Sequence, residues 1–295
     1  MAWFDGVLES IGKGLAEAGE SCLESGVEVW QFSTAKVLEY CTSDPVTLGS
    51  ATGNPWVSVT TIFSTFKGVG VGLLTLYFVI GYLRESIDIR SSFTLENMFR
   101  FFVRLILTAT ALDTALSLIR EVLGLSAKLA ATVGASVSSG DVPVGVFDNI
   151  MTGLSGGSWI GIGFICLLGG LIGMFVIIVC GYQILLAVVG RFFKIYLIVP
   201  FAPIAISSFA GGQGLSQSGI AWIKTFAGHC LEIVVIAMAL VLSFTMFGSG
   251  SGIFLAASDG VPGAILQICE LVLPIVIAVA SVKGAEATIR KCLGL

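Results

Sequence analysis

The sequence has 295 residues, of which 56% are hydrophobic and only 12% are charged, with a net charge of -4 and a mean hydropathy of +0.99. Soluble domains are roughly 45–50% apolar and about 25% charged, so this composition excludes an ordinary water-soluble protein. A spanning β-barrel would show ~10-residue segments of alternating polarity, whereas the apolar runs here are long and unbroken. We therefore expect an all-α integral membrane protein.

Residues 1–55 form an acidic region ahead of the apolar runs. Residues 1–44 carry eight acidic side chains, and apolar residues from Trp3 to Leu15 recur at helical spacing, which predicts an amphipathic helical region. Anionic lipid surfaces recruit Lys and Arg, so the side away from the cytoplasm is favoured for this region. Two interpretations stay open, a docking surface for a partner and a helix that lies at the bilayer surface. No cleavable signal peptide is recognised, so insertion is expected to rely on internal spans.

The membrane domain is expected to cover residues 56–295, with five spans of the roughly 20 apolar residues that a helix needs to cross a bilayer. These spans lie near residues 57–83, 97–118, 159–189, 220–247 and 264–282.

A shorter apolar segment lies between the third and fourth spans. Within residues 195–218, Pro200 and Pro203 interrupt the run, and Gly211, Gly212 and Gly214 follow. Non-helical backbone at membrane depth is tolerated where protein or water covers it, so we expect a re-entrant hairpin. A proline-kinked but complete span, which gives six crossings, is the alternative.

The basic residues favour five crossings over six, because Lys and Arg near span ends concentrate in the cytoplasm. With five crossings, ten basic residues share one side and four lie on the other, whereas six crossings place Lys194 and Lys224 on opposite sides. We therefore expect a multi-pass protein of the cell (inner, cytoplasmic) membrane, with its N-terminus outside and its C-terminus in the cytoplasm.

Ionisable residues at membrane depth cost at least roughly 2.5–3.5 kcal/mol each, so each one is a candidate functional residue. The candidates are Lys67, Asp113, His229, Glu232 and Glu270. His229 and Glu232 lie at i, i+3 on one helix face, where side chains meet. Polar contact between helices is the simpler explanation for this pair, and proton transfer is the sharper one.

No metal, cofactor or catalytic residue is expected. The His229 and Glu232 pair has no third metal ligand nearby in the sequence, and the seven cysteines form no CxxC pair. Cys22 and Cys41 are the one pair that could form a disulfide outside the cell. No nucleotide-binding or hydrolytic signature is present, which argues against an intramembrane enzyme.

Glycines four residues apart mark two candidate helix-packing faces, Gly68 with Gly72 and Gly169 with Gly173. Small residues at this spacing let helix backbones approach each other in lipid. We expect these faces to contribute to a homo-oligomer.

The middle of the chain resembles a known family. Its residues are Ile198-Val-Pro-Phe-Ala-Pro-Ile-Ala-Ile-Ser-Ser-Phe209, a Gly/Gln turn, and Gly219-Ile-Ala-Trp222-Ile-Lys-Thr-Phe226. This pattern resembles the TrbL-type polytopic subunit of conjugative type IV secretion systems, and the basic turn between Tyr77-Phe-Val-Ile-Gly-Tyr-Leu83 and Leu95–Leu105 is similar as well. One departure is that residues 210–219 carry no charge, although the family's central loop often does.

The resemblance implies an outside N-terminus, about five spans and self-assembly into a ring. It also implies contacts with a secretion ATPase, pilus subunits, other channel proteins and the transferred DNA–protein substrate. The bilayer itself, with a bound phospholipid as a further candidate, completes the expected partners.

The leading functional hypothesis is part of a translocation channel or a platform for pilus assembly. The alternative is an ion-coupled small-solute transporter or channel, in which Glu270, His229 and Glu232 are coupling groups. A scaffold without a pore is a third option that the residues do not separate from the first.

Overall fold

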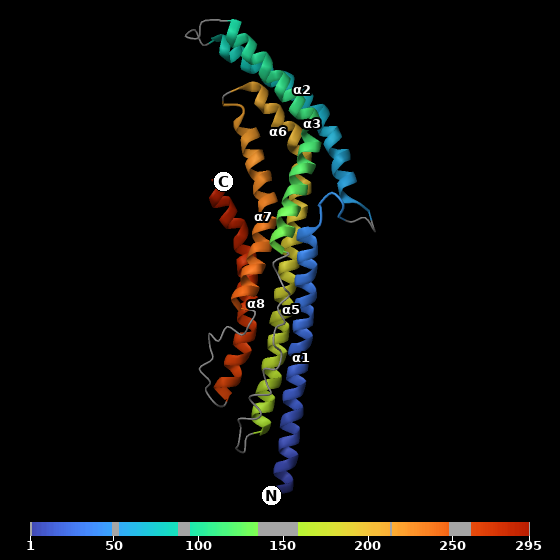
Figure 1. Cartoon of the computed structure of the whole chain (residues 1–295), viewed down its shortest axis with the longest axis vertical. Helices are drawn as coiled ribbons and strands as arrows, with labels where there is room; N and C mark the ends of the chain where they lie inside the picture. Colours follow the sequence, from blue (N-terminus) through green and yellow to red (C-terminus); the bar gives the residue numbers. More distant parts are fainter. Residues whose placement is uncertain are drawn as a thin grey trace. The chain divides into compact units, whose positions relative to one another are not determined.

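A computed structural model describes residues 2–48, 53–87, 95–134, 159–212, 214–247 and 261–294. In these ranges all regular secondary structure is helical (Figure 1). The elements are, in chain order, α1 (Ala2–Thr42), α2 (Pro55–Ile87), α3 (Leu95–Gly134), α5 (Trp159–Ile198), η1 (Val199–Phe201), α6 (Ala202–Ser207), η2 (Ser208–Gly211), α7 (Gln217–Phe247) and α8 (Val261–Leu293).

The expected fold class, an all-α membrane protein with about five spans, is confirmed. Five helical stretches are long and apolar enough to cross a membrane; they are Pro55–Arg84, Phe99–Gly134, Gly163–Gly211, Gln217–Ser243 and Val272–Cys292. Their boundaries differ from the expected ones, because hydropathy reports where the apolar part of a helix lies and not where the helix itself ends.

The chain divides into two compact units, and the boundaries between them fall within the helices α3, α5, α7 and α8. The first unit comprises residues Met1–Cys41, Ala131–Val188 and Val235–Glu286, and the second comprises Thr42–Ala130, Val189–Val234 and Ala287–Leu295.

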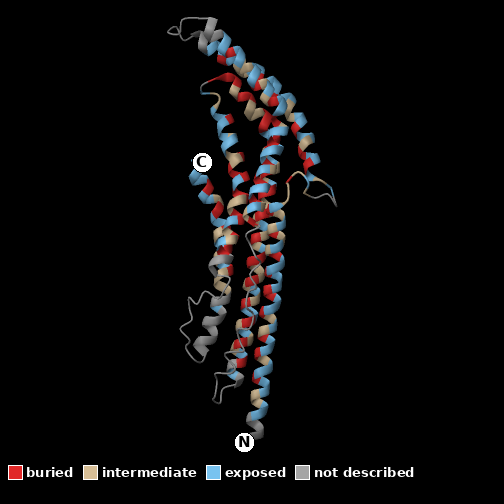
Figure 2. Ribbon diagram, in the orientation of Figure 1, coloured by how far each residue is buried: buried red, intermediate tan, exposed pale blue. Residues whose placement is uncertain are grey.

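In the first unit, α1 packs along the N-terminal part of α5 through small residues that repeat every seven positions. The buried positions Gly12, Gly19, Gly26 and Ser33 are spaced seven residues apart, and the larger buried side chains Ala16, Leu23, Trp30 and Val37 follow each of them by four. Figure 2 shows buried stretches alternating with exposed ones along α1. This spacing of three and four keeps one face of a helix on its neighbour.

The two helices are parallel and their backbones nearly touch. A Cβ atom at Gly19 would lie 2.6 Å from the carbonyl oxygen of Cys166, and one at Gly26 would lie 3.1 Å from Cα of Met174. On α5, a Cβ atom at Gly163 would meet Gly12. Helix α1 therefore packs tightly along α5 within the first unit. Its place relative to the bilayer stays a prediction.

In the second unit, α2 packs against the segment from η1 to η2. Buried Leu74, Leu112 and Ala210 form a core to which α2, α3 and η2 each contribute, and the surrounding half-buried residues are Tyr77, Phe78, Leu105, Ala109 and Ile206. The ring centroids of Phe78 and Phe101 lie 4.9 Å apart and join α2 to α3.

Helix α5 does not end near residue 189, as the sequence had suggested, but continues to Ile198. The basic residues Arg191 and Lys194 resemble the end of a span. Arg191 is nevertheless buried, with 4% of its surface exposed, and has a carboxylate partner inside the protein. Because its charge is compensated there, the helix can pass through this position.

Candidate functional site

The proline segment after α5 is helical throughout, which corrects the expectation of non-helical backbone. It is a succession of a 3-10 turn, one and a half turns of α-helix and a second 3-10 turn. Pro200 and Pro203 each lie in the first turn of a short helix, at N1 or N2. The N–H that proline lacks has no partner within the helix at such a position, so each proline starts a new short helix.

Backbone and side-chain hydrogen bonds satisfy backbone groups at these breaks. The amide of Ala202 bonds to the carbonyl of Val199 in 3-10 fashion. The indole Nε1 of Trp222, on α7, donates to the carbonyl oxygen of Ile198 over 3.1 Å. Unpaired carbonyls are costly in an apolar medium, so this contact stabilises the break and joins α7 to the end of α5.

A second side-chain contact closes the hairpin between η2 and α7. Ser208 Oγ donates to the carbonyl of Ala205 and accepts the amide N–H of Gly219 over 3.0 Å. Gly219 has no room for a side chain, because a Cβ atom would lie 2.6 Å from the ring of Phe209. The start of α7 is therefore held directly against the α6–η2 segment.

The turn of the hairpin depends on glycine. Gly212 and Gly214 have φ angles of 78° and 95°, in a region that other residues rarely adopt. Arginines from α2 and α3 lie over both: Nη1 of Arg104 would be 2.6 Å from a Cβ atom at Gly212, and Nη1 of Arg84 would be 3.0 Å from one at Gly214. Gln213, between them, lies outside the described residues.

Glycines of α2 let it approach the proline segment closely. A Cβ atom at Gly70 would lie 2.9 Å from both Cβ and the carbonyl oxygen of Pro203, and one at Gly81 would lie 2.8 Å from the carbonyl oxygen of Gly211. Gly68 and Gly72, which the sequence singled out, are exposed and would meet nothing within 4 Å. Their expected contact between copies of the chain stays a prediction. The packing within the chain uses Gly70 and Gly81 instead.

Three charged or titratable side chains meet inside the second unit. Nη2 of Arg191 lies 2.8 Å from Oε1 of Glu232, and Nη1 of Arg191 donates to the backbone carbonyl of Glu232 over 2.9 Å. Nδ1 of His229 lies 3.1 Å from Oε2 of Glu232. The side chains of Arg191 and Glu232 are 5% and 2% exposed. The expected meeting of His229 with Glu232 is therefore present, together with a cation from α5.

The guanidinium changes what this site can do chemically. Arg191 keeps its proton in proteins, so a fixed positive charge lies beside the carboxylate of Glu232. The contact at Oε1 is an ion pair without hydrogen-bond alignment, since that oxygen has no hydrogen-bond partner among the described residues. The principal chemical effect of the arrangement is to join α5 to α7.

Lys67 and Asp113 also form a pair, between α2 and α3. Nζ of Lys67 lies 2.8 Å from Oδ1 of Asp113, and the two side chains are 37% and 73% exposed. The side chain of the fifth candidate, Glu270, lies outside the part of the chain that the structure describes.

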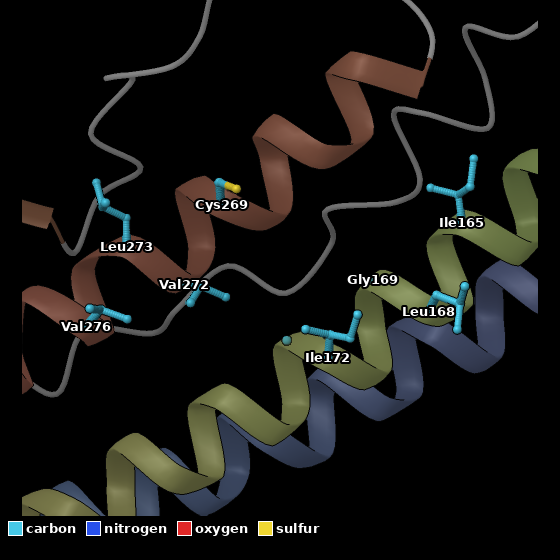
Figure 3. A pocket seen from close by; sticks show the side chains of 9 residues that line it. Ile165, Leu168, Gly169, Ile172, Cys269, Val272, Leu273 and Val276 are labelled. Carbon is cyan, nitrogen blue, oxygen red and sulfur yellow. The ribbon is translucent and has the colours of Figure 1, made fainter.

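Gly169 and Gly173 line an apolar cavity in the first unit, between α5 and α8. Its volume is about 490 Å³, and Figure 3 shows Ile172 of α5 and Val272 of α8 beside it. The other lining residues are Ile165, Leu168, Cys269, Leu273 and Val276. The predicted contact of Gly169 and Gly173 between copies of the chain stays untested, and the α1 contact uses Gly163 and Gly170 instead.

Among the described residues, no three His, Cys, Asp or Glu side chains are placed to hold a metal ion. Cys22 and Cys41 are both free thiols. No family model, curated protein or solved structure matches the chain.

Proposed function

We propose that this chain is a polytopic membrane subunit of a conjugative type IV secretion machine, in which several copies form part of the translocation channel or of the platform for pilus assembly. The proposal rests on the resemblance of residues 198–226 to the TrbL-type subunit. Its proposed partners are a secretion ATPase, pilus and channel subunits, and the transferred DNA–protein substrate.

One observation favours this proposal over the transporter alternative. Polar groups of the proline segment are hydrogen-bonded within the chain. Broken helices of ion-coupled transporters present unwound carbonyls and helix ends to their ions. Here the carbonyl of Ile198 accepts the indole N–H of Trp222, and Ser208 Oγ accepts the amide of Gly219. A broken segment whose polar groups are used within the chain is better suited to holding helices together than to binding an ion.

The second candidate function, ion-coupled transport, is favoured by one contact. His229 and Glu232 are buried and lie 3.1 Å apart, which is a protonatable pair inside an apolar helix. Coupling would require Glu232 to change its charge in each cycle.

Transfer measurements on a neutral pair separate the two functions. The double variant Arg191→Gln/Glu232→Gln removes both charges together and so avoids an uncompensated buried charge. We expect the transfer frequency to follow the amount of the variant in the membrane. The reason is that the pair holds helices together, so its loss lowers the amount of folded protein and not the activity of each copy. Loss of transfer at a normal membrane level would favour ion coupling. The control Glu9→Gln removes the charge of an exposed carboxylate that pairs with Lys13 on α1.

A further inference from the structure

The ion pair between Lys67 and Asp113 lies on the outer surface of the second unit. Both residues belong to candidate membrane spans, and the side chain of Asp113 is 73% exposed. Charged side chains at membrane depth almost always face a bundle interior or water rather than lipid. An exposed carboxylate in this position therefore needs a polar cover that a single chain does not provide.

Asp113 lies between the basic residues Arg120 and Arg104 of α3. At one end of the apolar part of α3, the guanidinium of Arg120 lies 5.8 Å from the centre of the Trp56 ring. At the other end, Arg104 lies beside the glycine turn. A rise of 1.5 Å per residue places Asp113 about 10 Å from Arg120 and about 14 Å from Arg104. Long Lys and Arg side chains can extend to the interface over part of such a distance, but aspartate is too short.

The surroundings of the pair match a helix-packing face better than the wall of a water-filled channel. Gly68 is exposed beside Lys67 on α2. On α3, the exposed hydroxyl of Thr114 donates to the carbonyl of Thr110 and is therefore internally satisfied. Ile106, two helical turns from Asp113 on the same side of α3, is a large apolar side chain that is also exposed. Small residues with isolated polar groups are typical of contacts between transmembrane helices.

We propose that this face of α2 and α3 packs against a second copy of the chain, so that Lys67 of one copy binds Asp113 of the next. Charge complementarity supports this occupant, because α2 presents the cation and α3 the anion, which are the two halves of a head-to-tail contact. The ammonium has three donors and the carboxylate two oxygens, so each group can bind within its own chain and across the interface.

The inference rests on the self-assembly that is part of the proposed function. It does not rest on the role in conjugation, because the particle size is measured independently of DNA transfer. Lys67→Glu and Asp113→Lys each place like charges together, and each should lower the oligomeric fraction in mild detergent about tenfold. The two variants, coexpressed with different tags, should copurify, because α2 of one then opposes α3 of the other with opposite charge. Glu9→Lys, which breaks the exposed pair between Glu9 and Lys13 on α1, is the matched control and should leave particle size unchanged.

An unchanged particle size in both single variants would overturn the proposal. The double variant Lys67→Glu/Asp113→Lys restores the ion pair within each chain. If it assembles normally while the two coexpressed single variants fail to copurify, the proposal is overturned as well.

Cross-linking tests the same face with the ion pair intact. Ser117→Cys, in a chain without its native cysteines, introduces a thiol at an exposed position one turn from Asp113. Oxidation should give cross-linked dimers. Monomers whose thiol reacts with a membrane-impermeant reagent would identify a water-filled lumen, and monomers that do not react would identify a lipid-facing surface.

Discussion

Replacing Gly19 by alanine tests the close contact of α1 with α5. The new Cβ atom would lie 2.6 Å from the carbonyl oxygen of Cys166, 2.9 Å from its carbonyl carbon and 3.0 Å from Cα of Leu167. All three atoms belong to the backbone, so no side chain can rotate away and the helices must separate. Gly14 is the matched control, because it lies on the same helix, is exposed, and would meet nothing within 4 Å.

The two substitutions should change stability in opposite directions. Alanine is better than glycine in a helix interior by roughly 0.5–1 kcal/mol, and Gly14→Ala should gain about that amount. Overpacking a close contact costs typically 1–3 kcal/mol, so Gly19→Ala should lose about 1–2 kcal/mol after the same gain. The unfolding midpoint in detergent, followed by near-ultraviolet circular dichroism during heating, should therefore rise for Gly14→Ala and fall for Gly19→Ala. Equal stabilisation by both substitutions would refute the parallel glycine contact.

Two further substitutions test the second unit by the same assay. Arg191→Met leaves Glu232 buried without its cation and should cost about 3–5 kcal/mol, whereas adding Glu232→Leu should recover most of the loss; no recovery would contradict a simple ion pair. Gly70→Ala should destabilise, because its Cβ atom would lie 2.9 Å from Pro203, while Gly72→Ala, which would meet nothing within 4 Å, should not destabilise the isolated chain. A midpoint that falls equally for both would remove the contact of α2 with the proline segment.

The sequence predicted the membrane helices well because the signal is a long apolar run, which needs no knowledge of neighbours. The α1 contact was also readable, but in a different pattern: Gly12, Gly19, Gly26 and Ser33 repeat every seven residues. The large apolar residues predicted an amphipathic helical region, for which a docking surface and a helix at the bilayer surface both stayed open. The small residues mark the face that packs on α5. In α2, Gly68 and Gly72 were chosen for a contact between copies, which stays a prediction, and the contact within the chain uses Gly70 and Gly81.

The ion pair of Arg191 with Glu232 illustrates what the sequence does not contain. The two residues are 41 positions apart, and Arg191 follows an apolar run as the last residue of a span would. Its burial depends on the hairpin, which returns α7 to α5. The His229 contact was predictable because both residues are on one helix at i, i+3. The pairing of Lys67 with Asp113 was not predicted for the same reason as that of Arg191 with Glu232: the two residues are on different helices.

The deep contact of α1 with α5 also changes how its acidic face should be tested, because deleting α1 would expose the glycine face of α5. Replacing Glu17, Glu24 and Glu28 by Gln removes exposed carboxylates and keeps the buried heptad. We expect a lower transfer frequency at a normal membrane level if partners dock there. Wild-type transfer by this variant would place the docking surface elsewhere.

The proposed role in conjugation is tested most directly by removing the chain from a cell that transfers its mobile element. Transfer frequency is measured for the deletion, for the deletion complemented by the tagged chain, and for the wild type. The account predicts that transfer is lost without the chain and restored by the tagged copy, and that the tagged chain copurifies from membranes with the secretion ATPase or pilus subunits. Wild-type transfer frequency in the deletion strain would contradict the proposed function.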